Sequence, residues 1–446
     1  MILATLTRLL RWIPLAILTG ILAGSASAFL LDALDWATNL RESHKAIIAL
    51  LPLAGLLVGC LYTCYGSSVE RGNNLILDEI HAEADAPNGV IPLRMTPLIL
   101  AGTILTHLFG GSAGREGTAL QTGASLADQL SIPFHLSRAD RRILLMAGIS
   151  AGFGSVFGVP LSGAIFGIEV LAIGKISYDA IGPCLLASFV GAMVTHAWGV
   201  HHTIYAITSV PRMSLLGFAS AIAAGIVFGL MAMTFANLTH AITRVSKRTI
   251  AWAPARPLVG GILVASAVFL LGTTKYIGLG IPTILAAFHT QLPPYDFAAK
   301  TLFTSVTLGM GFKGGEVTPL FFIGATLGNA LSHLLPLPSS LLAGMGMVAV
   351  FAGAANTPIA STLMAVELFG AEAGAFAGIA CIVSYLCSGH NGIYHAQRIR
   401  NSKYPVPLDD EDAASVLSHP PASPKTYPPS STDPDLRPAT TSDKLN

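Results

Sequence analysis

Apolar segments follow one another from Trp12 to about Ser388, and few charged residues interrupt them. Only 11% of the residues are charged, against about 25% in a soluble domain, so the chain has too little polar surface to cover a globule in water. The clearest apolar segments are 12–34, 45–65, 92–109, 138–153, 160–174, 178–198, 213–242, 257–274, 297–311, 318–335, 339–353, 358–370 and 373–388. The sequence therefore predicts an all-α polytopic membrane protein in a lipid bilayer.

Several of these segments are nearer to about 15 residues than to the roughly 20 that cross a bilayer. Short helices broken by Gly and Pro are tolerated at membrane depth only where they are buried in protein or line a cavity. This favours a transporter or channel over a simple membrane anchor. A net charge of +1 gives no general attraction for nucleic acid. The five cysteines all lie in apolar stretches and are interpreted as packing residues, so no metal site and no cofactor is predicted.

Two glycine-rich breaks in the apolar pattern resemble one another at a spacing of 200 positions. The first, GSAGREGTALQTGASL, begins at Gly111, and the second, GFKGGEVTPLFFIGATLG, begins at Gly311. Each carries one glutamate at the break, Glu116 in the first and Glu316 in the second. Paired Gly-interrupted segments in the two halves of a membrane protein are the best sequence pointer to a transport site.

A second matched pair of segments lies 198 positions apart. Pro160 and Pro358 are each followed nine positions later by a glutamate, Glu169 and Glu367. If an odd number of membrane crossings separates the two halves, they are inverted and a site forms between them at the midplane. The sequence does not fix that number. Because Glu169 and Glu367 recur by repeat symmetry, we expect structural roles at helix ends rather than catalysis.

Glu116 lies in GREGT, at the start of an apolar run and therefore near a helix N-terminus. Backbone N–H groups and the positive end of the helix dipole bind anions there. An unpaired carboxylate inside a membrane is costly unless it is functional. We expect Glu116 to occupy an anion site when ionised and to leave it when protonated. The alternative is a static ion pair with Arg115.

GREG and the later pattern AGxxAGF…FxxPLxGxxFxxE at 147–169 resemble the CLC family of anion channels and proton-coupled anion antiporters. The resemblance covers most of residues 12–400. It implies a CLC-type inverted repeat of broken and tilted helices and a homodimer with a separate pore in each subunit. It also implies that Glu116 is the gating glutamate that exchanges protons for anions.

The chain departs from the common family pattern at the anion path. Asn73 stands where the family motif GSGIP has its central serine, GREGP reads GREGT with Thr118, and GxFxP reads GEVTP with Val317 and Thr318. The internal proton-handling glutamate of chloride/proton antiporters would follow Glu169 directly, but that position is Val170. Together these departures resemble the fluoride-exporting branch of the family.

Fluoride is small and strongly hydrated, so removing its water is expensive unless strong donors replace it. An asparagine amide offers two donors and a hydroxyl offers one. Tyr394, in NGIY after the last apolar segment, can donate a phenolic O–H from the cytoplasmic side; its alternative role is a tyrosine of the interfacial belt. The anion-binding residues that the resemblance implies are Asn73, Thr118, Val317, Thr318 and Tyr394, with Gly72, Asn74 and Lys313 as further candidates.

Glu316 has no counterpart in the chloride-type members. Because Val170 cannot carry a proton, another group must connect Glu116 to the cytoplasm, and we predict that Glu316 is this relay. A buried carboxylate close to another carboxylate and a bound anion can hold a proton near neutral pH. The alternative is a structural acid bonded to backbone donors at the helix start. Lys313 either neutralises this region or snorkels to the surface.

Two further groups of polar residues are expected to be exposed to solvent and not to form functional sites. The cluster Asp78, Glu79, His81, Glu83 and Asp85 suggests a metal site, but its stretch continues into a polar loop, so a solvated face is expected, with Glu79 at a helix end. His201 and His202 lie in a loop-like stretch and are expected to be solvated.

Residues 1–403 are predicted to form the transport domain, with inverted halves at roughly 12–199 and 213–400. Residues 404–446 are rich in Pro, Ser and Thr and are predicted to be a disordered cytoplasmic tail. The positive-inside rule places both termini in the cytoplasm, given the basic clusters at Arg8 and Arg11, Arg138, Arg141 and Arg142, Arg244, Lys247 and Arg248, and Arg398, Arg400 and Lys403.

The sequence therefore predicts a proton-coupled fluoride exporter of a bacterial inner membrane, with fluoride and protons as its ligands and a second copy of itself as its partner. The alternatives within the same fold are a chloride/proton antiporter and a passive chloride channel. A membrane-embedded enzyme is disfavoured, because the chain shows neither a nucleophile–base pair nor an HExxH-type ligand spacing.

Overall fold

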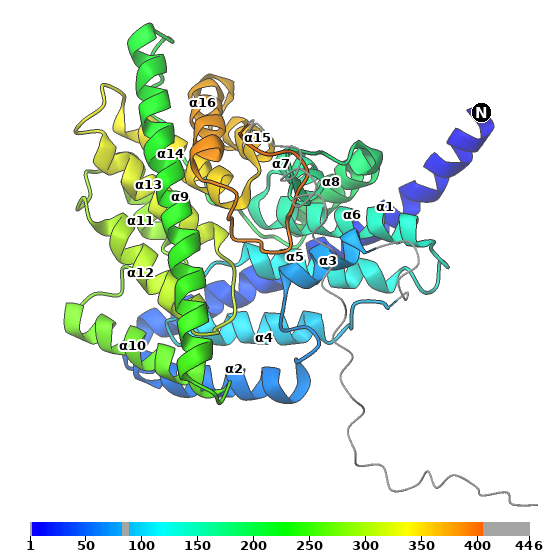
Figure 1. Ribbon diagram of the computed structural model, residues 1–446, viewed down its shortest axis with the longest axis horizontal. Coiled ribbons are helices and arrows are strands. Elements are labelled where there is room, and N and C mark those ends of the chain that lie inside the picture. Colours follow the sequence, from blue (N-terminus) through cyan, green and yellow to red (C-terminus); the bar gives the residue numbers. More distant parts are fainter. Residues whose placement is uncertain (1, 83–88, 405–446) are drawn as a thin grey trace, which may run out of the picture. The chain divides into compact units, whose positions relative to one another are not determined.

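A computed structural model describes residues 2–82 and 89–404, which form sixteen α-helices, two 3-10 helices and two short strands (Figure 1). The helices before residue 199 are α1 (Ile2–Ser43), η1 (Lys45–Leu50), α2 (Leu51–Tyr65), α3 (Asn73–His81), α4 (Met95–Leu108), α5 (Glu116–Gln129), α6 (Arg138–Phe157), α7 (Pro160–Glu169), η2 (Tyr178–Ala180) and α8 (Ile181–Ala197). The helices after it are α9 (Leu215–Thr249), α10 (Ala255–Leu271), α11 (Ile281–His289), α12 (Asp296–Gly309), α13 (Val317–Leu331), α14 (Ser339–Ala355), α15 (Pro358–Phe369) and α16 (Ala371–Cys387). The predicted tail at 404–446 lies outside the described residues apart from Tyr404.

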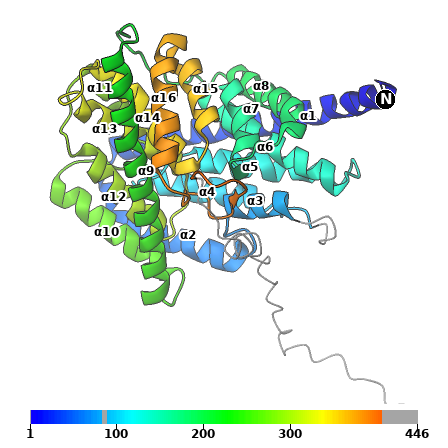
Figure 2. The same cartoon turned by 45° about the horizontal axis from the view of Figure 1, so that its top comes forward.

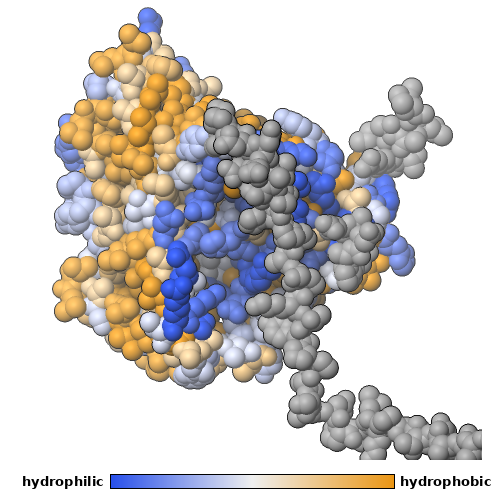
Figure 3. All heavy atoms as spheres, in the orientation of Figure 1, coloured by the Kyte–Doolittle hydropathy of each residue, from blue (hydrophilic) through white to orange (hydrophobic). Residues whose placement is uncertain are grey.

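Long and short helices are combined in the helical body. Among the described residues, four helical segments are long and apolar enough to cross a membrane, namely Arg11–Ser43, Lys45–Tyr65, Tyr178–Ala197 and Leu215–Thr249. The shorter apolar helices are α4, α10, α13, α14, α15 and α16. Helix α9 packs against α14 and α16 (Figures 1 and 2). Hydrophobic side chains cover much of the face around the upper part of α9 and around α10, and hydrophilic ones gather towards the centre of the same view (Figure 3). These features confirm the predicted class of fold.

Helices α7 and α15 show that the two halves are inverted. The carboxylate of Glu169, at the end of α7, accepts from the N–H groups of Ile359 (3.0 Å) and Ala360 (2.8 Å) at the start of α15. The carboxylate of Glu367, near the end of α15, accepts from Leu161 (2.9 Å) and Ser162 (2.8 Å) at the start of α7. The equivalent helices therefore run antiparallel, and each glutamate satisfies N–H groups that lack partners within the opposite helix.

Glycine allows the same close helix contact in both halves. A Cβ on Gly123 of α5 would lie 2.4 Å from the carbonyl oxygen of Gly148 in α6. In the second half, a Cβ on Gly324 of α13 would lie 2.0 Å from the carbonyl oxygen of Gly346 in α14. Only residues without a side chain permit this approach, which is common between helices in membranes. The repeat in the sequence is thus also a repeat of packing.

The chain after α16 returns to the first half of the molecule. Strand β2 (Arg398–Ile399) pairs in parallel with β1 (Ala172–Ile173), which follows α7. Ile393 N–H donates to the carbonyl oxygen of Ala354 at 2.8 Å, at the end of α14. This short sheet is the one sheet among the described residues, and it ties the segment that carries Tyr394 to the end of α7.

Candidate functional site

The two glycine-rich breaks meet at the centre of the molecule. Gly114 and Gly315 form an antiparallel bridge, with Gly114 N–H donating to Gly315 O at 2.6 Å and Gly315 N–H donating to Gly114 O at 2.8 Å. A Cβ on Gly315 would lie 2.6 Å from the backbone nitrogen of Gly117, so glycine is required there. Helices α5 and α13 begin directly after the bridge, and their N-termini face one another.

Glu116 is the first residue of α5, and its side chain is fully buried. One carboxylate oxygen, Oε2, accepts from Thr318 N–H at 3.0 Å and from Arg115 N–H at 3.1 Å. The other oxygen, Oε1, accepts from the Thr318 hydroxyl. Thr318 N–H belongs to the first turn of α13, where helix N–H groups lack internal acceptors and the dipole favours negative charge. The carboxylate therefore occupies a position that suits an anion.

Arg115 stands beside this carboxylate without a direct hydrogen bond from its guanidinium. Its Nε lies 3.7 Å from Glu116 Oε1, and this Nε is buried with no hydrogen-bond partner among the described residues. The Thr318 contacts are shorter and come from the opposite half of the molecule. Glu116 is therefore held mainly by α13, and a static pair with Arg115 does not account for its position.

A cavity of about 150 Å³, called the inner cavity here, lies where α3, α13 and the segment after α16 come together. Asn73, the first residue of α3, Glu316 and Tyr394 line it. The Tyr394 hydroxyl oxygen and the Asn73 Oδ1 atom are buried and have no hydrogen-bond partner among the described residues. Buried polar atoms without partners are rare in native structures, so two of them at one cavity indicate a ligand site.

Hydrogen bonds between side chains and backbone hold the segment that carries Tyr394. Asn74 Oδ1 accepts from Ala396 N–H at 2.9 Å, which ties α3 to the segment that carries the tyrosine. Gln397 Nε2 donates to Val170 O at 3.0 Å, at the end of α7. Asn74 therefore lines the inner cavity and also positions its wall.

Glu316 is the N-cap residue of α13, but its side chain makes no cap hydrogen bond with that helix. It is partly exposed and lines the inner cavity. Glu116 lines another cavity, so the two carboxylates face different spaces from adjacent helix starts. The alternative, a structural acid bonded to backbone donors at the helix start, remains open beside the relay.

The remaining predicted residues have distinct environments. Thr118 shares a hydrogen bond of 2.6 Å with the Thr103 hydroxyl of α4 and does not line the inner cavity. Val317 is fully buried at the start of α13. Gly72 has φ +56° before α3, and a Cβ there would lie 3.0 Å from the Gln121 side chain. Lys313 Nζ lies 3.9 Å from the centre of the Tyr62 ring and the residue lines the inner cavity, so it faces the protein interior.

Gln121 was missed by the sequence reasoning. It lies in α5, is 6% exposed, and lines the inner cavity opposite Gly72. The available signal was a large amide in the middle of a stretch, Gly117–Ala127, whose other residues are small or apolar. His202 was expected to be solvated, but it is only partly exposed: its ring lies against Gly158 and its Nε2 atom is buried. It lines a small cavity with Glu116, called the outer cavity here.

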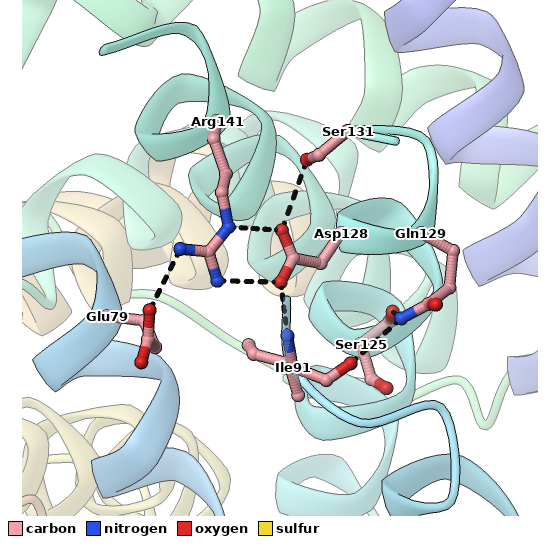
Figure 4. Close-up of polar contacts among 7 residues, drawn as sticks. All are labelled: Glu79, Ile91, Ser125, Asp128, Gln129, Ser131 and Arg141. Atoms are coloured by element: carbon pink, nitrogen blue, oxygen red, sulfur yellow. Dashed lines mark hydrogen bonds and ion pairs between the residues drawn. The ribbon is translucent and has the colours of Figure 1, made fainter. Parts of the chain in front are cut away.

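The acidic cluster at 78–85 is divided between different partners. Glu79 Oε2 accepts from Arg141 at 2.8 Å, and Arg141 also donates to both oxygens of the buried Asp128 at 2.7 and 2.8 Å (Figure 4). Asp128 further accepts from Ile91 N–H at 2.7 Å. The cluster members Asp78 and His81 contact Arg71 and Leu171 O, and Glu83 and Asp85 lie outside the described residues. Among the described residues, no group of three or more His, Cys, Asp or Glu forms a metal site.

The sequence matches a known family model over most of its helical part. The model described as voltage gated chloride channel covers residues 76–389. A Pseudomonas syringae pv. tomato protein named Chloride/fluoride channel protein is 56% identical over 407 residues, which are 90% of this chain and 89% of that relative. A Salmonella typhi protein named Voltage-gated ClC-type chloride channel ClcB is 26% identical over 86% of this chain and 98% of its own length.

Solved structures of similar fold include two antiporters. A CLC-type fluoride/proton antiporter superimposes with a TM-score of 0.83 and 35% identity, covering 88% of this chain and 98% of the other. A slow cyanobacterial Cl−/H+ antiporter gives a TM-score of 0.73 with 21% identity, over 85% of this chain and 94% of the other. At this identity the similarity is evidence for the fold alone.

Proposed function

This chain belongs to the voltage gated chloride channel family of multi-pass membrane proteins, and from that membership we propose that it exports fluoride in exchange for protons. The observation that carries the proposal is the Glu116 carboxylate, seated on the N–H and hydroxyl of Thr318. A group that occupies the anion path when charged and vacates it when protonated couples two ions that move in opposite directions. Glu116 is the group that alternates.

The donors around the path support fluoride as the anion. Fluoride loses strong hydration on entering a protein, and only strong, closely placed donors replace that water. Asn73 and Tyr394 line the inner cavity, and the Thr318 hydroxyl donates to Glu116 at the start of α13. An Asn amide oriented with its N–H groups towards the anion offers two donors. We propose that fluoride passes from the inner cavity, between Asn73 and Tyr394, to the Thr318 position.

Glu316 is proposed as the proton relay on the inner side. It lines the inner cavity directly before Val317, while Glu116 binds to the next residue, Thr318. Val170, at the position of the proton-handling glutamate in chloride-type members, is buried and apolar. A proton that enters the inner cavity therefore has Glu316 as the adjacent carboxylate on the way to Glu116.

Two similar proteins support the choice of anion and of mechanism. The 56% identical relative is named a chloride/fluoride channel protein, and the 35% identical structure is that of a fluoride/proton antiporter. The first name favours a channel and the second an antiporter. We place this chain with the antiporter, because the gating carboxylate is accompanied by a second carboxylate at the opposite helix start.

We further propose a homodimer in a bacterial inner membrane, with both termini in the cytoplasm. Arg11, near the N-terminus, forms an ion pair of 3.2 Å with Asp140, within the basic cluster at 138–142. Arg398, from another basic cluster, donates to His81 O at 3.1 Å. The Arg11 contact joins the N-terminal basic residues to the cluster at 138–142, and such a shared basic face supports a cytoplasmic location by the positive-inside rule.

Reconstitution in liposomes tests the proposal. Purified protein in fluoride-loaded vesicles should release fluoride while protons enter, and chloride-loaded vesicles should give much slower flux. Equal fluoride and chloride fluxes would contradict the assignment of the anion. Fluoride flux with no opposed proton movement would instead show the passive channel.

A further inference from the structure

The outer cavity lies beside Glu116 and has no lining residue in common with the inner cavity. Its volume is about 10 Å³, which is close to the space that one water molecule needs. Arg115, Glu116, His202, Tyr205 and Thr318 are among its lining residues. It therefore brings the gating carboxylate next to an ionisable ring from the segment that connects α8 and α9.

Two polar atoms of the residues around this cavity are buried without partners. His202 Nε2 and Arg115 Nε each lack a hydrogen bond among the described residues. Buried polar groups normally find a protein or water partner. These two atoms lie beside a carboxylate and a space the size of one water molecule. The arrangement indicates a site that can hold a water and pass protons, rather than one that only packs.

The position of the His202 ring depends on Gly158. This glycine is the C-cap of α6 with φ +70°, and a Cβ there would lie 2.4 Å from His202 Cδ2. The imidazole consequently lies against bare backbone at the C-terminus of α6. The partial negative charge at a helix C-terminus stabilises a protonated histidine, so the ring can carry a proton transiently at this place.

The groups that surround His202 keep the ring neutral at rest. Burial lowers its pKa to about 4, and Arg115, His196 and His201 act in the same direction. Glu116 and Tyr205 are the other ionisable residues that line the outer cavity. A neutral imidazole has one N–H and one lone pair, so it can accept a proton on one nitrogen and release one from the other.

A larger space connects this region with the surface. A vestibule of about 480 Å³, lined by Arg41, Lys45 and Lys275 among others, shares Thr203 and Ile281 with the outer cavity. Thr203 directly follows His202 in the chain. The outer cavity, with His202 in its lining, is thus adjacent to this larger space.

Taking proton-coupled transport as given, we propose that His202 delivers protons between the outer solution and Glu116. In one step a ring nitrogen accepts a proton from vestibule water, and the other ring nitrogen gives its proton to a carboxylate oxygen of Glu116, directly or through one water. The proton donor is a hydronium ion of the vestibule, which leaves as water: its O–H bond breaks as one N–H bond forms, and the other N–H bond breaks as one O–H bond forms on Glu116. The neutral ring then returns to its first tautomer, and Glu116 leaves the donors of Thr318 as a neutral acid.

The test measures fluoride-driven proton uptake in liposomes with the wild type, His202→Gln and His201→Gln. His201 is exposed and does not line the outer cavity, so its variant serves as the matched control. His202→Gln should slow proton uptake by about tenfold or more, as expected for loss of a positioned acid–base group. In His202→Ala, which leaves the space of the ring empty, imidazole in the outer solution should restore the rate, and fluoride binding measured by calorimetry should be unchanged. His201→Gln should behave like the wild type.

Each outcome decides the proposal. Proton uptake by His202→Gln at the wild-type rate would overturn it. A slowed rate that imidazole does not restore, or that accompanies a loss of fluoride binding, would show a structural role and would overturn it as well. A wild-type protein that moves no protons against fluoride would contradict the proposed function itself, whereas failure of the His202 proposal leaves wild-type coupling intact.

Discussion

Thr318 donates to both oxygens of the Glu116 carboxylate, with its backbone N–H at 3.0 Å from Oε2 and its hydroxyl bonded to Oε1. The two residues come from opposite halves of the chain, so the gate is made by the repeat and not by either half alone. Thr118, which matches Thr318 in the repeat, bonds instead to Thr103. The two halves are therefore similar in fold but different in the chemistry of their helix starts.

Thr318→Val should reduce the preference for fluoride over chloride. The change keeps the shape of the side chain and removes one hydroxyl donor, and a hydrogen bond to a charged group is worth about 1.5–3 kcal/mol, or roughly tenfold and more in affinity. The measurement is the ratio of fluoride to chloride flux in liposomes. Thr118→Val is the matched control and should keep the wild-type ratio, because its hydroxyl bonds to Thr103. Equal effects of the two substitutions would contradict this assignment.

Glu316→Gln should abolish proton coupling. The amide keeps the size of the side chain but cannot take up and release a proton, so fluoride flux should continue without opposed proton movement. Simultaneous recording with fluoride and pH electrodes measures the coupling. Glu70→Gln removes another carboxylate from the lining of the inner cavity and should leave coupling unchanged. Antiport that survives Glu316→Gln intact would show that the relay is elsewhere.

Tyr394→Phe should weaken fluoride binding without destabilising the protein. The Tyr394 hydroxyl is buried and has no partner among the described residues, so its removal breaks no internal bond. Loss of one donor to a charged ligand should weaken affinity by about tenfold or more. Calorimetric titration with fluoride measures the affinity, and a melting curve in detergent is the control for folding. A lower melting temperature with unchanged affinity would assign the hydroxyl a structural role.

Arg141→Met should destabilise the protein strongly. Arg141 pairs with Asp128, which is fully buried (Figure 4). Loss of the guanidinium leaves the Asp128 carboxylate in the interior without an opposite charge. Breaking one side of a buried ion pair costs about 3–5 kcal/mol. Thermal unfolding in detergent measures the loss. Arg142→Met is the control, since the Arg142 side chain is 41% exposed and its ion pair with Asp179 is 3.9 Å long. Similar melting temperatures for the two variants would contradict a structural role for the Arg141 cluster.

The sequence predicts the fold from features that depend on composition and local pattern. Apolar length identifies the helices, and glycine-rich breaks identify the points where helices begin within the membrane. Their inversion could not be read from the chain, because it depends on how many segments cross. The reciprocal bonds of Glu169 and Glu367 with α15 and α7 give the antiparallel relation directly.

The site was harder to predict where it depends on the orientation of side chains. Thr118 and Thr318 occupy matched positions, but the sequence does not tell which of the two hydroxyls points at the other half. In the structure Glu116 reaches the start of α13, while Glu316 faces the inner cavity. His202 has no periodic pattern around it, and the sequence does not show that its ring lies against the bare backbone of Gly158.

Uphill proton movement driven by a fluoride gradient tests the account most directly. Vesicles loaded with fluoride are placed in fluoride-free solution with the membrane voltage held at zero, and their interior begins slightly more acidic than the outside. The account predicts that fluoride leaves while protons enter against the pH gradient, and that Glu116→Ala abolishes this proton movement. Fluoride loss with protons that only flow down their own gradient would contradict it.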